Sequence, residues 1–274
     1  GGYCNKIAYG VDYSSIVGGY CNRVDYNVDW SSIVGGCCNR ISYTSYLSSI
    51  LGGHCNSVSC SSCNSSTIGG NCDFIICNSC NSTILGGMTN SVNCAKGSSI
   101  IGSCNSIISY CSDYSVISGG IGNSICHSNA TGYFNYCGSS IISGGLYNKI
   151  CYGFTSNIIT SLNSTIYEAA GGSIISSYNG YLYYIGSASL IANASSKIYY
   201  RSSNSAIIGG ENNTIYNSNR SVILGGLNQY LNRSETVLVP DLFISGSVSP
   251  NNGINYGQTQ NVFVSGFGTF SFIN

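Results

Sequence analysis

Cysteine is the residue of this chain that is best equipped to do chemistry. The chain has 16 cysteines, and all of them lie between Cys4 and Cys151. Such a density is typical of an oxidising compartment, where cysteines pair as disulfides. Thiolates are also zinc ligands, so the spacing of the cysteines has to decide between crosslinks and metal binding.

Two closely spaced pairs match a zinc-site pattern. Cys60 and Cys63 are followed by Cys77 and Cys80, so each residue of the first pair has a counterpart 17 residues later. If successive 17-residue units stack as parallel strands about 4.8 Å apart, these counterparts fall within the disulfide range of about 4.4–6.8 Å between Cα atoms. We therefore favour disulfides or stacked thiols over zinc here.

The same spacing connects a pair of acids and a further column of cysteines. Asp12 and Asp29 lie 17 residues apart. We favour two solvated carboxylates, and a cation such as Ca²⁺ bound between them is the alternative.

The cysteine column has an odd number of members, so one stays free, pairs sideways or crosses to another chain. Its members are Cys4, Cys21, Cys38, Cys55 and Cys72.

Residues for catalysis are sparse. The histidines are His54 and His127, and His54 stands where other units have Tyr3, Tyr20 or Cys37, so we expect it on the surface. Nothing places a histidine beside a nucleophile and an orienting acid. The nine acidic residues are scattered and do not suggest a glycosidase pair. We expect neither enzymatic activity nor a cofactor.

An internal repeat positions all of these residues. The first three units read GGYCNKIAYGVDYSSIV, GGYCNRVDYNVDWSSIV and GGCCNRISYTSYLSSIL. The apolar positions are β-branched and fall in two short segments, which favours strands. The double glycine indicates a corner with positive φ or close packing. The repeat therefore predicts an all-β fold, a parallel β-solenoid of 17-residue coils over residues 1–236.

The period is not uniform along the predicted solenoid. Units of 25, 24 and 24 residues begin at Gly119, Gly144 and Glu168, so we expect longer coils over 119–191. Their inserts fall at about 126–138, 151–163 and 175–187, and thirteen coils give a rod of roughly 60 Å. Residues 237–274 leave the repeat and read as a short C-terminal β-strand and hairpin segment.

Stacking aligns equivalent residues into columns. Two apolar columns form the predicted core: Ile7, Val24, Ile41, Val58, Ile75 and Val92 in one, and Ile16, Ile33 and Ile50 in the other. An asparagine column would bond amide to amide along the axis, or bond its own backbone at a turn. It contains Asn5, Asn22, Asn39, Asn56 and Asn90, with Asp73 substituting once.

Two further residue types point to the surface. Tyrosine is abundant, and aromatic faces suit sugars as well as packing between chains. The binding-surface candidates are Tyr133, Tyr136, Tyr152, Tyr181 and Tyr183. Sequons offer glycosylation candidates at Asn64, Asn81, Asn129, Asn163, Asn193, Asn212, Asn219 and Asn232.

Composition restricts the partners. Charged residues are 7% of the chain and the net charge is zero, which excludes an electrostatic footprint for nucleic acid or an anionic membrane. No apolar run approaches the roughly 20 residues needed to span a bilayer. Two apolar columns make a thin core, so we expect the coils to bury more surface in a homo-oligomer, with a trimer around a common axis favoured.

The G-G-x-x-N-x-(I/V)…S-x-I repeat resembles the arrays of tail-fibre and capsid-fibre proteins of large phages and related viruses. It is similar, more distantly, to the head repeats of trimeric autotransporter adhesins. The segment TVLVPDLFISG, residues 236–246, is similar to the one that follows such arrays. The resemblance covers nearly the whole chain and implies a homotrimeric attachment protein on a virion or cell surface. The cysteine and tyrosine content departs from it.

The expected function is therefore a structural, adhesive and non-catalytic fibre or filament subunit, extracellular or on a cell or virion surface, with a host-surface glycan or protein as receptor. An alternative is a cellular extracellular filament that polymerises end to end by strand addition. An ice- or glycan-binding monomeric solenoid is less favoured, because the variable segments are irregular.

Overall fold

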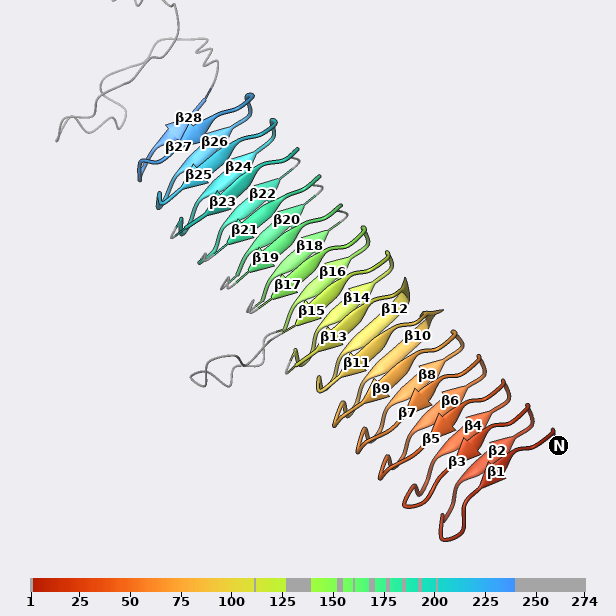
Figure 1. The fold of residues 1–274 in the computed structure, drawn as a ribbon. Coiled ribbons are helices and arrows are strands. Elements are labelled where there is room, and N and C mark those ends of the chain that lie inside the picture. Colours follow the sequence, from red (N-terminus) through yellow and green to blue (C-terminus); the bar gives the residue numbers. More distant parts are fainter. Residues whose placement is uncertain are drawn as a thin grey trace, which may run out of the picture. The chain divides into compact units, whose positions relative to one another are not determined.

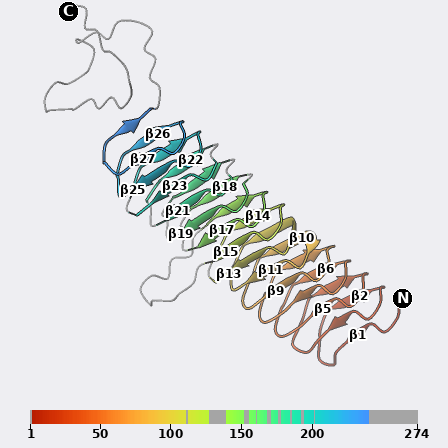
Figure 2. The same cartoon turned by 45° about the horizontal axis from the view of Figure 1, so that its top comes forward.

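The computed structural model describes residues 2–110, 112–126, 139–151, 155–159, 161–167, 171–175, 178–183, 186–191, 194–200 and 202–239. The chain divides into two units, Gly1–Pro240 and Asp241–Asn274. The described part of the first unit is a parallel β-solenoid, as the repeat predicts, and its strands stack coil upon coil (Figures 1 and 2). The second unit lies outside the described residues.

Each coil contributes one strand to each of two parallel sheets, and 14 strands are described in each. The first sheet contains β1 (Lys6–Ile7), β3 (Arg23–Val24), β5 (Arg40–Ile41), β7 (Ser57–Val58), β9 (Phe74–Ile76), β11 (Ser91–Asn93), β13 (Ile107–Ser109), β15 (Ser124–Cys126), β17 (Lys149–Cys151), β19 (Thr165–Tyr167), β21 (Tyr181–Tyr183), β23 (Lys197–Tyr199), β25 (Thr214–Tyr216) and β27 (Tyr230–Leu231).

The second sheet contains β2 (Ser15–Val17), β4 (Ser32–Val34), β6 (Ser49–Leu51), β8 (Ser66–Ile68), β10 (Thr83–Met88), β12 (Ser99–Cys104), β14 (Val116–Ser118), β16 (Ile141–Ser143), β18 (Asn157–Ile159), β20 (Ser173–Ile175), β22 (Ser189–Ile191), β24 (Ala206–Ile208), β26 (Val222–Leu224) and β28 (Val237–Leu238).

The core is one inward residue from each sheet per coil. In the first sheet, Val24 pairs with Ile41 and Ile41 with Val58, and all three are fully buried. Ile33 and Ile50 form the facing column in the second sheet. The two predicted apolar columns are therefore confirmed except in the first coil, where Ile7 is 42% exposed and Ile16 is half-buried, because β1 and β2 each pair with a strand on one side only.

The prediction of long coils over 119–191 is wrong except for the first coil. Ile117 pairs with Ile142 across a 25-residue coil, as predicted. After it, Ile142 pairs with Ile158, Ile158 with Ile174 and Ile174 with Leu190, so residues 144–191 form three 16-residue coils, not two of 24.

The described residues of the predicted inserts at 151–163 and 175–187 thus belong to regular coils, and the described part of the chain gives each sheet 14 strands where thirteen coils were expected. The sequence disguises these coils because Thr160-Ser161 and Ser176-Ser177 replace the double glycine. Within the insert expected at 126–138, residues 127–138 lie outside the described residues. The predicted boundary at 236 is also too early, because β28 pairs with β26 and continues the second sheet.

The asparagine column joins each coil to the backbone of the next. The Oδ1 atom of Asn22 accepts the N–H of Asn39 at 3.0 Å. Its Nδ2 donates to the carbonyls of Gly35 and Gly36 at 3.2 and 3.1 Å, and at 3.4 Å to Gly18 of its own coil. Of the two predicted alternatives, Asn22 does not form the amide-to-amide ladder, whereas its contact with Gly18 is the predicted bond to the backbone of its own turn. Its other bonds satisfy corner backbone groups of the next coil that stacking would otherwise leave buried and unpaired.

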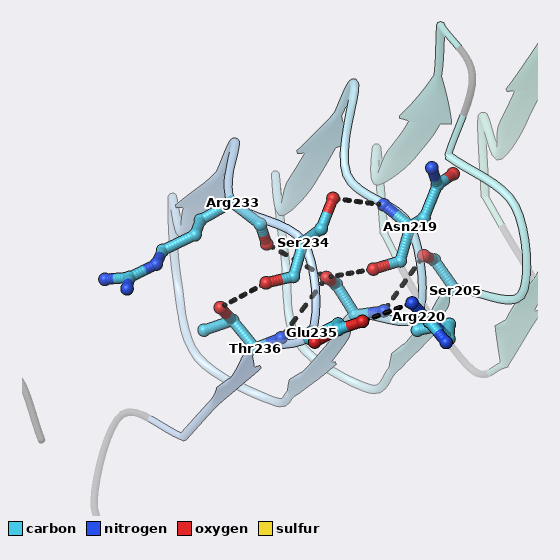
Figure 3. Close-up of polar contacts among 8 residues, drawn as sticks. Ser205, Asn219, Arg220, Arg233, Ser234, Glu235 and Thr236 are labelled. Carbon is cyan, nitrogen blue, oxygen red and sulfur yellow. Dashed lines mark hydrogen bonds and ion pairs between the residues drawn. The ribbon is translucent and has the colours of Figure 1, made fainter. Parts of the chain in front are cut away.

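A serine column does the same at a second corner. The Oγ atom of Ser31 donates to the carbonyl of Ser45 at 3.1 Å and accepts the N–H of Ser48 at 3.0 Å. The same arrangement recurs in the last coils, where Ser221 donates to the carbonyl of Arg233 at 2.9 Å. Figure 3 shows Arg233 there, together with Ser205 and Asn219. An ion pair between Arg220 and Glu235 lies beside it.

The double glycine is required for two different reasons, one for each glycine. Gly35 and Gly36 both have positive φ, +71° and +80°. A Cβ atom at Gly35 would meet nothing within 4 Å, whereas one at Gly36 would lie 2.5 Å from the carbonyl oxygen of Gly53 and would also strike the Asn39 amide. The second glycine therefore makes room for the asparagine contact.

This difference predicts the outcome of a matched pair of substitutions. Gly35→Ala costs only the left-handed backbone conformation, about 1–2 kcal/mol. Gly36→Ala adds a steric clash and displaces the Asn39 amide, and we expect it to cost about 1–3 kcal/mol more. Chemical denaturation of the two variants measures the difference, and equal losses would contradict this account of the corner.

Asp73 is the one member of the described asparagine column that cannot make all of its contacts. Its Oδ1 accepts the N–H of Asn90 at 2.9 Å, but its Oδ2 has no hydrogen-bond partner where an asparagine would donate from Nδ2. Burial raises the pKa of this carboxyl group. A raised folded-state pKa stabilises the fold below the unfolded value and costs stability as pH rises through the folded value.

We therefore expect Asp73→Asn to raise the free energy of unfolding at pH 7 by about 1–3 kcal/mol, because it replaces an unpaired buried oxygen with a donor. The gain should shrink as pH falls toward 4. Asn56→Asp is the matched reverse exchange and should destabilise at pH 7. Denaturation at several pH values measures both, and a gain for Asp73→Asn that is independent of pH would refute the carboxylate as its cause.

Candidate functional site

The predicted cysteine column lies on an accessible corner between the second sheet and the first. Cys4 and Cys38 are exposed, and Cys21, Cys55 and Cys72 are half-buried. All five have φ between 53° and 58°. No disulfide joins these five cysteines to one another. Burial and the neighbouring Cys38 and Cys72 raise the pKa of the Cys55 thiol.

His54 is exposed, as expected, and lies within this thiol corner. Its Nε2 is 3.7 Å from the sulfur of Cys55. The preceding coil brings the sulfurs of Cys37 and Cys38 to 3.4 Å from each other. Two groups of possible metal ligands share His54: one with Cys37 and Cys38, the other with Cys55 and Cys72. Sequence reasoning missed this cluster because it treated the histidine position and the cysteine column separately.

Neither group contains the predicted zinc candidates. Among the described residues, no cluster of three or more possible ligands includes Cys60, Cys63, Cys77 or Cys80. The thiols of Cys63 and Cys80 instead donate to carbonyls of the preceding coil, those of Thr44 at 3.5 Å and Ser61 at 3.1 Å. These cysteines behave as corner residues.

The predicted acid pair also has a structural role. The N–H of Asp12 donates to Oδ1 of Asp29 at 2.8 Å, so one carboxylate caps the backbone of the preceding coil. Among the described residues, no third ligand group joins the pair.

The predicted surface residues divide by position. Tyr181 is half-buried and, with Tyr183, lies in β21, not in an insert. Tyr133, Tyr136 and Tyr152 lie outside the described residues. The sequons Asn129 and Asn193 also lie outside them, while the other six are exposed: Asn64, Asn81, Asn163, Asn212, Asn219 and Asn232.

A long apolar stripe on the outer face of the second sheet was not predicted. The last residue of β2 pairs with the last residue of β4, and this pairing continues along the sheet. The central residue of each strand points into the core, so its neighbours point outward. Ser118 and Ser143 interrupt the stripe. Its exposed members are Val17, Val34, Leu51, Ile68, Leu85, Ile101, Ile159, Ile175, Ile208 and Leu224.

A second thiol pair joins the two neighbouring strands β15 and β17. Cys126 in β15 pairs in register with Cys151 in β17, and their sulfur atoms are 2.8 Å apart. The hydrogen bond from Cys151, aided by the charge of Lys149, lowers the pKa of Cys126 to about 7, while the same bond and burial raise the pKa of Cys151. A thiolate beside a second thiol is the arrangement from which a disulfide forms.

No family model and no curated protein matches the chain. The described residues contain no helix whose length and hydrophobicity would let it cross a membrane. Support for a function therefore comes from the geometry of the surface.

We expect mild oxidation to join Cys126 and Cys151. The crosslink closes a loop of about 25 residues and should raise the free energy of unfolding by about 3 kcal/mol over the double variant Cys126→Ser, Cys151→Ser. Peptide mapping identifies the bond and denaturation measures the gain. Cys104→Ser is the control, because Cys104 pairs with Met88 and Ile121 and has no thiol in register with which to form a disulfide. Loss of the gain in that control would contradict the assignment.

In the reduced protein, alkylation should reach Cys126 first at neutral pH. The thiolate is the nucleophile, so the labelling rate should rise with pH and be half-maximal near pH 7. Cys55, whose pKa is raised, should react only at higher pH. Labelling followed by mass spectrometry compares the two residues. A Cys126 profile no lower than that of Cys55 would show that Cys151 does not activate it.

Proposed function

We propose that this chain is a structural, non-catalytic subunit of a surface-displayed fibre or filament, extracellular or on a virion, and that it assembles through the apolar stripe of the second sheet. The solenoid supplies a stiff scaffold whose period repeats each surface residue at the strand spacing of about 4.8 Å. The stripe is the observation that carries the proposal.

The stripe fits burial in an assembly better than exposure on a free rod. Six successive coils place a valine, leucine or isoleucine at its position, from Val17 to Ile101. Contiguous apolar patches larger than a few hundred Å² mark interaction sites on soluble proteins. Serine or threonine fills the other outward position of these strands, from Ser15 to Ser99, so the strands do not require apolar residues on this face.

A closed homo-oligomer suits such a stripe. Copies related by rotation about an axis parallel to the rod bring the same stripe together along their full length, and three copies close the ring. The exposed tyrosines, such as Tyr3 and Tyr20, which stack at 5.3 Å, then remain on outer surfaces as contacts for a receptor glycan or protein.

The test is the mass of the native assembly by light scattering, with and without reductant, together with negative-stain imaging. We expect a discrete mass of three chains and short rods. Open-ended polymers would indicate end-to-end joining instead, and a monomeric wild-type chain would overturn the assembly proposal.

We further expect the double variant Leu51→Ser, Ile68→Ser to shift the assembly toward single chains. Serine occupies the same column at Ser118 and Ser143, so the coil should tolerate the exchange. Leu47→Ser is the matched control, because Leu47 is 57% exposed but lies at a corner away from the stripe. An equal loss of mass in both variants would show that the stripe is not the interface.

A further inference from the structure

The thiol corner around His54 has the composition and spacing of a metal site. Cys37, Cys38 and His54 offer ligand atoms within 4.8 Å of one another, and so do His54, Cys55 and Cys72. Zinc bound tetrahedrally at about 2.3 Å from sulfur and about 2.0 Å from nitrogen separates its ligands by roughly 3.5–3.8 Å. The distances of 3.4 Å between the Cys37 and Cys38 sulfurs and 3.7 Å from Cys55 to His54 fall near that range.

The backbone does not explain why these positions are cysteine. Residues in this column have φ near +55° in every described coil, a conformation in which asparagine is several-fold enriched. Later coils use asparagine there, at Asn105, Asn163 and Asn179. Cysteine at Cys38, Cys55 and Cys72 therefore occupies a backbone conformation that favours asparagine, and it offers a sulfur atom that asparagine lacks.

The surroundings of His54 favour a ligand role for its ring. Its Nδ1 lies 3.4 Å from Oδ1 of Asn71 in the next coil. When Nδ1 carries the proton and faces this acceptor, the lone pair of Nε2 is directed to the side of the Cys55 sulfur. A second-shell partner that fixes the tautomer in this way accompanies most metal-binding histidines. The ring is also exposed, so an ion reaches it from solvent.

We propose that Cys37, Cys38, His54, Cys55 and Cys72 form a surface binding site for a thiophilic divalent ion of the zinc class. His54 supplies the nitrogen ligand common to both groups, and three successive coils supply the thiolates. This inference does not depend on the proposed assembly, since all five residues belong to one chain.

The experiment uses the full chain, reduced and handled without oxygen. Co²⁺ is the spectroscopic probe, because tetrahedral thiolate coordination gives intense visible bands and a sulfur-to-metal charge-transfer band. Zn²⁺ should displace it, and competition with a chromophoric chelator gives the Zn²⁺ affinity. We expect His54→Tyr and Cys55→Asn to lower that affinity at least about tenfold. Both substitutions introduce residues that the same columns use elsewhere, Tyr20 and Asn105.

Cys77→Asn is the matched control, because Cys77 has the same left-handed backbone, φ 57°, and lies outside both ligand groups. It should bind Zn²⁺ as the wild type does. Circular dichroism checks that each variant folds, and His54→Asn, after Asn71 in the next coil, replaces any variant that does not. A reduced wild-type chain without a tetrahedral Co²⁺ spectrum would overturn the site. An equal loss in Cys77→Asn would overturn it too, by showing that scattered thiols hold the ion.

Discussion

The constraint on which this solenoid depends is the satisfaction of backbone polar groups at its corners. Most coils of about 17 residues contain only two strands, each of two or three residues. Much of the backbone therefore lies in turns that stacking buries. Water cannot reach these groups, and leaving them unpaired costs about 1–3 kcal/mol each. Asn22 and Ser31 meet the need by accepting an N–H from the next coil and donating to its carbonyls. The abundance of asparagine, serine and glycine follows from this geometry.

The repeat period was enough to predict the fold, because a strict step of 17 aligns Val24 with Ile41 and Ile33 with Ile50 whatever the details of the turns. Where the glycine pair is replaced, the prediction failed. The described residues of 144–191 belong to three coils, in which Asn163 and Asn179 keep the positive φ that Cys38 has at the equivalent position of a glycine-pair corner. Glycine was thus an incomplete marker of corners, whereas the inward isoleucines Ile158 and Ile174 marked the strands throughout.

The candidate sites were less predictable than the fold, for a related reason. A column assigns residues to neighbouring coils but does not say which corner they share with another column. His54 directly precedes Cys55 and is in register with Cys37, so the sequence places these residues at one corner. It does not show that the histidine ring and the sulfurs come within 4.8 Å of one another. The Cys126–Cys151 pair was hidden by the 25-residue coil between the two cysteines, although the Ile125–Ile150 pairing of the same strands fixes its register. Predicting the apolar stripe required knowing which face of each strand in the second sheet points inward.

Linear repetition also gives the two surface features different extents along the solenoid. The apolar stripe extends from β2 to β26 and so concerns the whole length of the solenoid. The cysteine column ends at Cys72, and Thr89, Asn105, Gly122 and Tyr147 follow at the same position in the next described coils. A change in the thiol corner therefore affects at most the first five coils, and the remaining coils keep both their core and their stripe. Since each coil contacts only its neighbours, stability is close to a sum of local terms. Chemistry can accordingly vary at one end of the solenoid without altering the apolar stripe of the remaining coils.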